Sequence, residues 1–268
     1  MAERKDLTAY ERVLLARDND RPTGMKFIDG LFTDFVELHG DRRYGDDPAV
    51  VGGIARLAGR PVTVICIEKG SDVREHIKRN FGMAHPEGYR KSLRLMRQAE
   101  KFGRPVICLV DTSGAYCGMG AEERGQGQAI AENIIGMLSL RTPTISIITG
   151  EGGSGGALAL ACADRVWMLE NAAYSVITPE GCASILWKDA EKKAEAAEAL
   201  GLTADKLASL GIIDRVIPEQ SDDWDMTMSA LRDALASEVS KLCEYDEERL
   251  LSERYNKYRS MGVNGQDW

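Results

Sequence analysis

Residues 144–162 read TISIITGEGGSGGALALAC, and this stretch decides the fold class. Residues 144–148 form an apolar, β-branched run of strand length, and residues 157–162 have the composition of a short helix. Five glycines among residues 150–156 join the two. A strand that passes through glycines into a helix is typical of α/β folds, in which ligands bind where strand carboxyl ends meet helix amino ends.

The unit before this stretch has the same order. Residues 106–110 (VICLV) form a second apolar run, the polar loop 111–116 follows, and a helical pattern extends over about 121–140. This alternation predicts an α/β fold with mainly parallel strands buried on both faces. Further strands are expected in other short apolar runs, at residues 50–57, 62–67, 166–169, 174–177 and 212–217.

Helical patterns flank these units. Apolar residues repeat at helical spacing in residues 7–14 and 27–38, with a break at 18–22. A helix is expected over 86–102, because proline suits its first turn, and the polar stretch 69–85 before it is expected to be a loop. The chain is therefore divided into an N-terminal helical segment (1–40), a central α/β domain (41–220) and a C-terminal helical tail (221–268).

The composition is that of a folded, acidic protein. Of 268 residues, 44% are hydrophobic, and 34 Lys and Arg against 42 Asp and Glu leave a net charge of −8. This charge gives no bulk attraction to nucleic acid or to an anionic membrane. No run of about 18 apolar residues is present, and the charged start MAERKD lacks signal-peptide character, so a cytoplasmic protein is expected.

The cysteines and histidines predict no metal site. The six cysteines include no CxxC pair, and there are only three histidines. Cys66, Cys108, Cys162 and Cys182 lie in apolar or small-residue stretches and are expected to be reduced core residues.

Three nucleotide or hydrolase motifs fit the glycine stretch poorly. Gly150, Gly152 and Gly155 match G-x-G-x-x-G, but only about eight residues remain for the helix before the next strand, too few for a dinucleotide-binding unit. Ser154 matches the G-x-S-x-G of serine hydrolases, but all three histidines precede it in the chain. A phosphate-binding Walker loop requires a lysine after its last glycine, where Gly156 stands.

A glycine-lined helix amino end remains. The backbone N–H groups of Gly155 and Gly156 have no partner within a helix, and with the helix dipole they are suited to bind a developing negative oxygen. The alternative is that the glycines serve only close packing of helix against strand. The residues alone leave both interpretations open.

Several strings resemble one family closely, the carboxyltransferase alpha subunit of bacterial multisubunit acetyl-CoA carboxylase. The resemblance extends over about residues 25–219. It is carried by RNFGM (79–83), PEGYRK (86–91), GAY (114–116), GAEERG (120–125), GEGGSGGALAL (150–160) and SVITPEGCASILWK (175–188).

The resemblance implies a crotonase-like (ClpP/crotonase) fold of stacked β-β-α units with peripheral helices, the central part being the carboxyltransferase domain. It implies transfer of the carboxyl group of carboxybiotin to acetyl-CoA, giving malonyl-CoA in the first step of fatty-acid synthesis. In this family the alpha subunit pairs with a zinc-ribbon beta subunit, usually as α2β2. Biotin is carried on a biotin carboxyl carrier protein and is charged by an ATP-using biotin carboxylase, and no metal is expected in this chain.

The resemblance also assigns residues. The N–H groups of Gly155 and Gly156 would form the oxyanion hole for the ureido oxygen of biotin. Substrate- or cofactor-binding residues would be Gly114, Ala115, Tyr116, Gly152, Gly153, Ser154, Pro179, Glu180 and Gly181. Apart from the resemblance, clustered basic residues in an acidic chain would meet CoA phosphates or an acidic partner, unless they are only a solvated helix face: Arg79, Arg90 and Arg94.

Two other functions stay open at this stage: a subunit of another biotin-dependent acyl-CoA carboxylase or decarboxylase, and a non-catalytic scaffold for the beta subunit. The sequence also departs from the family pattern, since Ser113 and Cys117 stand where the family has prolines. Proline fixes φ, so its absence leaves two alternatives open for Cys117: an exposed thiol in a looser loop, or a core residue.

Overall fold

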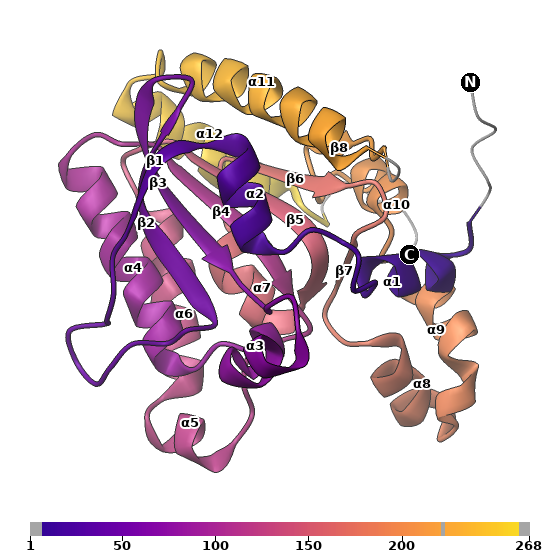
Figure 1. Ribbon diagram of the computed structural model, residues 1–268. Helices are drawn as coiled ribbons and strands as arrows, with labels where there is room; N and C mark the ends of the chain where they lie inside the picture. Colours follow the sequence, from indigo (N-terminus) through magenta and orange to yellow (C-terminus); the bar gives the residue numbers. More distant parts are fainter. Residues whose placement is uncertain (1–6, 221–222, 263–268) are drawn as a thin grey trace.

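In the computed structural model, which describes residues 7–220 and 223–262, eight strands form one mixed sheet at the centre of the molecule (Figure 1). The order across the sheet is β1-β2-β3-β4-β5-β6-β8, and β7 pairs with the end of β5. The strands are β1 (Thr33–Glu37), β2 (Val50–Leu57), β3 (Arg60–Ile67), β4 (Val106–Thr112), β5 (Thr144–Gly153), β6 (Arg165–Leu169), β7 (Ala173–Ser175) and β8 (Arg215–Ile217).

Strand direction divides the sheet. β2 runs antiparallel to both β1 and β3, whereas every pairing from β3 to β8 is parallel. All seven residues of β4 are buried. Burial on both faces explains why the continuous apolar runs of β4 and β5 predicted parallel strands correctly.

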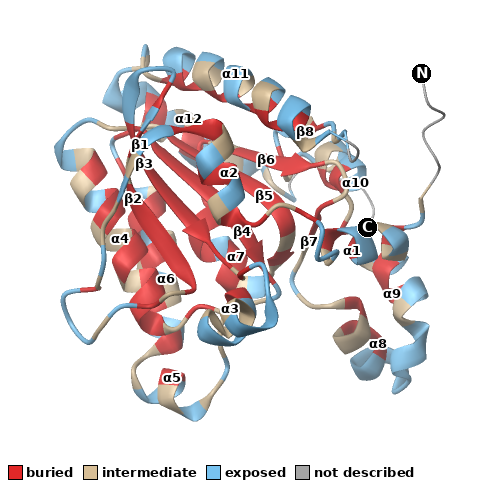
Figure 2. Ribbon diagram, in the orientation of Figure 1, coloured by how far each residue is buried: buried red, intermediate tan, exposed pale blue. Residues whose placement is uncertain are grey.

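Helices cover both faces of the sheet, and their inner sides are buried with it (Figure 2). Neighbouring residues of β3 show this, because Cys66 faces α2 while Ile65 lies on the side of α4. The helices are α1 (Ala9–Ala16), α2 (Gly24–Leu31), α3 (Val73–Lys78), α4 (Pro86–Lys101), α5 (Met119–Glu123), α6 (Gln126–Leu138), α7 (Ser154–Ala161), α8 (Pro179–Trp187), α9 (Lys193–Leu200), α10 (Ala204–Ser209), α11 (Trp224–Leu242) and α12 (Glu247–Ser260), with short 3-10 turns η1 (Asn80–Gly82) and η2 (Ala190–Lys192).

Three predicted segments were wrong in detail. The helical spacing of apolar residues over 27–38 predicted one helix, but the helix covers only the first part of this range. Residues 33–37 form β1 and pair with β2. The stretch 69–85 was expected to be a loop but contains α3 and η1, with Asp72 capping α3 by accepting from the Glu75 N–H. The expected helix 121–140 is two helices, α5 and α6, since Gly125 has φ +80 between them.

The glycine stretch also differs from expectation. Residues 150–153 are the end of β5, not a loop, and α7 follows at once from Ser154. The strand is extended because it pairs with β7, where Gly152 lies opposite Tyr174. Pairing of this kind joins distant parts of the chain, so the local sequence could not show it.

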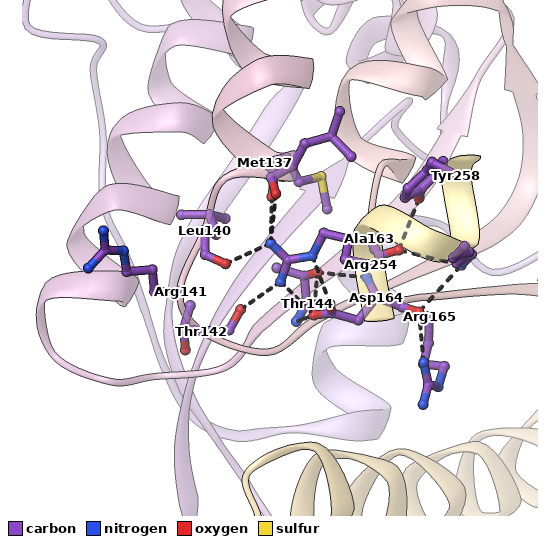
Figure 3. A network of polar contacts seen from close by, with 12 residues as sticks. Met137, Leu140, Arg141, Thr142, Thr144, Ala163, Asp164, Arg165, Arg254 and Tyr258 are labelled. Carbon is purple, nitrogen blue, oxygen red and sulfur yellow. Dashed lines mark hydrogen bonds and ion pairs between the residues drawn. The ribbon is translucent and has the colours of Figure 1, made fainter. Parts of the chain in front are cut away.

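The carboxyl-terminal helices α11 and α12 are confirmed, and they belong to the main core. Leu231 and Leu235 of α11 are buried within it. Arg254 of α12 is also buried, with Nε 2.7 Å and Nη2 2.8 Å from the two carboxylate oxygens of Asp164 (Figure 3). The division at residues 40 and 220 stays a prediction, as the sheet and its core draw on all three segments.

The four cysteines predicted to lie in the core are buried, and the position of Cys117, which the sequence left open, is at the surface. The four are Cys66, Cys108, Cys162 and Cys182. In residues 7–220 and 223–262, no helix combines the length and apolar character needed to cross a membrane.

Candidate active site

The amino end of α7 is the centre of the candidate site. Gly153 is its N-cap residue, and within the described part of the chain no side chain caps the helix there. Ser154, the first helical residue, has φ +51, a conformation that costs a non-glycine residue roughly 1–3 kcal/mol and that collects at functional sites. The N–H groups of the first turn point out of the helix without intrahelical partners.

Gly155 and Gly156 differ in what surrounds them. A Cβ placed on Gly156 would lie 2.6 Å from the backbone nitrogen of Ala115 and 2.7 Å from the carbonyl carbon of Gly114. A Cβ placed on Gly155 would lie 3.5 Å from Ile130 Cγ2, an ordinary contact distance. Close packing therefore explains the glycine at 156, but it does not explain the glycine at 155.

Close packing also explains the glycine at position 153. A Cβ on Gly153 would lie 2.1 Å from the carbonyl oxygen of Ser113. The loop that follows β4 and the junction of β5 with α7 are thus in direct backbone contact. No side chain larger than hydrogen fits at either contact position.

The loop 113–116 is held by its own residues. Gly114 has φ +152, and the Thr112 hydroxyl both accepts from the Gly114 N–H at 3.0 Å and donates to the Gly114 carbonyl at 2.7 Å. The Tyr116 N–H donates to the Ala84 carbonyl at 3.1 Å. Gly114 and Ala115 are therefore brought against α7, although proline is absent from this loop, and their role in binding substrate or cofactor stays a prediction.

A cavity of about 340 Å³ opens beside Gly155. Its lining is mainly apolar and comes from α7, β7 and the region of α9 and α10: Ser154, Gly155, Leu158, Tyr174, Ser175, Val176, Leu200, Leu207 and Ile212. Ile130, which a Cβ on Gly155 would contact, is not part of this lining. Apolar walls with few polar groups at the rim are typical of small-molecule sites.

The other predicted binding residues lie apart from this cavity. Gly152, Gly153 and Pro179 line a separate space of about 20 Å³. Glu180 is bound by Arg17, whose Nη1 lies 2.9 Å from its Oε1, and the Gly181 N–H donates to the Thr178 hydroxyl at 3.2 Å.

Charged residues that the sequence analysis did not single out surround the strand end. Arg17 Nε donates to Glu151 Oε1 at 2.8 Å, which links α1 to β5. Asp111 accepts from the Glu151 N–H at 2.9 Å and forms an ion pair with Lys69 Nζ at 2.7 Å. Asp111 could have been noticed at the end of a predicted strand, whereas Arg17 gave no local signal.

The ionisation of the two glutamates differs. Burial raises the pKa of Glu151 and outweighs the effect of Arg17. Burial also opposes the charged form of Glu180, but hydrogen bonds from Arg17 lower the pKa of that carboxyl overall. Arg17 itself has a raised pKa: burial opposes its charge, but its two acidic partners outweigh that effect. This cluster fastens α1 and α8 to the end of β5.

Tyr89 is a further residue beside the site. Its side chain is fully buried, and its hydroxyl lies 3.0 Å from the position of a Cβ on Gly156. Among the described residues this hydroxyl has no hydrogen-bond partner. Burial raises the pKa of Tyr89, so it stays a neutral phenol next to the amino end of α7.

The three arginines predicted to contact CoA or a partner form hydrogen bonds within the chain. Arg79 donates to Glu75 at 2.8 Å and to the Pro48 carbonyl at 2.7 Å. Arg90 donates to the Arg124 carbonyl, and Arg94 donates to the Gly40 carbonyl at 3.0 Å. Their role toward CoA or a partner stays a prediction.

Within residues 7–220 and 223–262, no group of three or more His, Cys, Asp or Glu side chains is arranged to hold a metal ion. The described site offers backbone donors, an apolar cavity and a helix dipole.

Comparison with known proteins places these features in context. Residues 2–262 match a family model described as acetyl co-enzyme A carboxylase carboxyltransferase-like. The acetyl-coenzyme A carboxylase carboxyl transferase subunit alpha of Ruminiclostridium cellulolyticum is 59% identical over 257 residues, which cover 96% of this chain and 99% of that protein. A protein of Clostridium tetani that carries subunits beta and alpha together is 52% identical over 260 residues, and the chain spans 45% of its length.

Solved structures show the same fold. A transcarboxylase 12S structure matches 82% of this chain with a TM-score of 0.67 at 22% identity. The chain spans 42% of the length of that transcarboxylase. The likeness confirms the expected crotonase-like α/β fold.

Proposed function

The chain belongs to the acetyl co-enzyme A carboxylase carboxyltransferase-like family, and from this premise we propose that it is the alpha subunit that transfers the carboxyl group of carboxybiotin to acetyl-CoA, forming malonyl-CoA. It is a transferase subunit, and it acts with a separate beta subunit. The observation that carries the proposal is identity of 59% over 96% of the chain to a protein of that name.

The residues around α7 fit biotin. Its fused rings are mostly apolar, with one urea carbonyl, and the cavity offers apolar walls with the backbone of Gly155 at its rim. Gly155 supplies a backbone donor, and Leu158 and Val176 supply apolar surface. A volume of about 340 Å³ lies within the range of about 300–1,000 Å³ that is usual for small-molecule sites.

Carboxybiotin, when bound, brings the carboxyl group, and its ureido nitrogen can take up a proton. The chain's own contribution is to bind and orient. The Gly155 N–H would donate to the ureido oxygen, and the dipole of α7 would stabilise negative charge there. Apolar side chains at the cavity exclude water, which strengthens this donation. No acid or base side chain of this chain is required in this scheme.

The partners are proposed from the relatives. A beta subunit is supported by the Clostridium tetani protein, in which beta and alpha form one chain. The beta subunit would carry the zinc ribbon and most of the acetyl-CoA site, while a biotin carboxyl carrier protein and a biotin carboxylase would supply carboxybiotin. An α2β2 assembly in the cytoplasm is part of the proposal, and six free cysteines fit a reducing compartment.

Reconstitution tests the proposal. The full chain is mixed with a zinc-ribbon beta subunit, acetyl-CoA and a carboxylated carrier protein, and malonyl-CoA is measured by mass spectrometry. We expect product from the pair and none from the chain alone. Product from the chain alone would contradict the division of the site between two subunits, and no product from a correctly assembled pair would contradict the activity.

A further inference from the structure

The carboxyl end of α7 is bound by side chains from several parts of the chain. The last four carbonyl groups of a helix have no intrahelical partner. Each of these four in α7 accepts a side-chain hydrogen bond: Leu158 from Cys162 Sγ at 3.3 Å, Ala159 from Asn133 Nδ2 at 2.8 Å, Leu160 from Ser146 Oγ at 2.5 Å, and Ala161 from Tyr258 Oη at 3.2 Å. The donors come from the end of α7, from α6, from β5 and from α12.

Two of these donors are fully buried. Asn133 and Ser146 are each 0% exposed, so water cannot replace them if the helix moves. Breaking either bond would leave a buried carbonyl unsatisfied, which costs about 1–3 kcal/mol. These bonds therefore fix α7 along its own axis.

Helix α12 adds a third attachment just past the helix end. The Tyr258 hydroxyl lies 3.2 Å from the Ala161 carbonyl oxygen and 2.9 Å from that of Ala163, so its single proton is shared between them. The Arg254 guanidinium donates hydrogen bonds to both carboxylate oxygens of Asp164. Figure 3 shows Tyr258 and Arg254 on one helix, reaching the same turn of chain from two sides.

The opposite end of α7 has contacts of another kind. Its amino end is in backbone contact with Gly114 and Ala115, and within the described chain no side chain accepts from its N–H groups. The helix has only eight residues, which is about 12 Å. Over so short a rigid rod, a shift at the carboxyl end moves the amino end by the same amount.

We propose that Ser146, Asn133 and Tyr258 are positioning residues that act through α7 to hold the Gly155 N–H at the ureido oxygen of biotin. The inference rests on the proposed function. Oxyanion donors must lie at about 2.7–3.1 Å from the charged oxygen, and a misplacement of 1 Å can cost about 10²-fold in rate. The carboxyl-terminal bonds supply the fixed position that such a donor needs.

The test uses Ser146→Ala, Tyr258→Phe and their combination in the full chain, paired with the beta subunit. Matched controls are Ser92→Ala, a buried serine that donates to the Gly88 carbonyl of α4 at 2.7 Å, and Tyr255→Phe on the exposed side of α12. We expect kcat to fall about tenfold in the combined variant, part of the roughly 10²-fold that a 1 Å shift can cost, with KM unchanged for both substrates. The controls should keep the kcat of the unmodified chain.

A second measurement does not depend on the reaction. In the chain labelled with ¹⁵N-glycine, the amide order parameter of Gly155 should be near 0.85 and should fall toward about 0.6 in the combined variant, while that of Gly59 in the β2–β3 turn should not change. If the unmodified pair makes no malonyl-CoA, the proposed function fails, and this measurement still decides the positioning role.

Three outcomes overturn the inference. They are an unchanged kcat in a variant whose melting temperature has fallen, an equal loss of kcat in the controls, and an unchanged order parameter at Gly155. If the combined variant does not fold, Tyr258→Phe alone is decisive, because it keeps the ring and removes only the hydroxyl.

Discussion

Helices α7 and α8 begin near each other, since Gly153 and Pro179 line the same small space, but their amino ends are satisfied in different ways. At α8 the Thr178 hydroxyl accepts from the Gly181 N–H, Pro179 removes a donor at the first position, and Glu180 lies in the first turn. At α7 the corresponding positions are glycines and one serine, and the described chain provides no side-chain cap.

The carboxyl ends show the reverse. α7 ends inside the core, with four carbonyl groups bound by side chains. α8 ends at Trp187, after exposed Ile185 and Leu186, on an arm that lies apart from the sheet (Figure 1). A helix whose amino-terminal N–H groups are uncapped and whose carboxyl end is fixed is suited to hold an anion. The amino end of α8 is already capped by its own residues.

The largest effect is expected where α12 anchors the end of α7. Arg254→Met leaves the buried carboxylate of Asp164 without its cation, and breaking a buried pair in this way costs about 3–5 kcal/mol. Urea unfolding measures the loss. Arg249→Met on the same helix breaks an exposed ion pair, in which the side chains of Arg249 and Glu253 are 56% and 40% exposed. This variant should lose no more than about 1 kcal/mol of stability. Equal losses in the two variants would contradict a core role for α12.

The next effect concerns the open end of α7. Gly155→Pro removes the N–H at a position in the first helical turn, and the loss of one oxyanion donor lowers kcat by about 10²–10³-fold. Gly155→Ala is the matched control, because it keeps the N–H and its Cβ would meet Ile130 Cγ2 at 3.5 Å, an ordinary contact distance. Steady-state kinetics of the paired subunits would separate the two, provided that thermal melting shows both variants folded. Normal turnover in a folded Gly155→Pro chain would falsify the donor role.

A smaller effect separates the two glycines by stability. Gly156→Ala places a Cβ 2.6 Å from the Ala115 nitrogen, and such overpacking typically costs about 1–3 kcal/mol. Gly155→Ala should be neutral or stabilising by up to about 1 kcal/mol, since alanine favours the helix and its Cβ has room. Denaturant midpoints measure both changes. Comparable destabilisation by the two variants would mean that position 155 is also a packing position.

The smallest expected change in stability concerns the capped amino end of α8. Thr178→Ala removes the cap of that helix and should cost about 0.5–2 kcal/mol, whereas Thr178→Ser should retain most of the stability. Hydrogen exchange of the α8 amides reports the change locally. If the alanine variant leaves exchange in α8 unaltered, the cap does not stabilise the helix.

The sequence predicted those parts of the site that depend on neighbouring residues. Strands β4 and β5 followed from apolar runs, α4 from Pro86 at its start, and the open amino end of α7 from glycines after a strand. It did not predict Arg17 or Lys69 beside the site, or Tyr258 at the carboxyl end of α7, because each comes from a distant segment. Local pattern carries no information about such contacts.

The pattern of residues predicted that an α/β chain presents the backbone of Gly155 and Gly156 at a helix start, and the resemblance suggested the biotin role that we propose for it. The folded chain alone shows that the backbone of Ala115 packs against Gly156, whereas Gly155 lines a cavity. It also shows that α12 holds the far end of α7 through Tyr258. The reason is physical: helix and strand formation depend on residues a few positions apart, whereas packing and hydrogen-bond partners depend on which segments the folded sheet brings together.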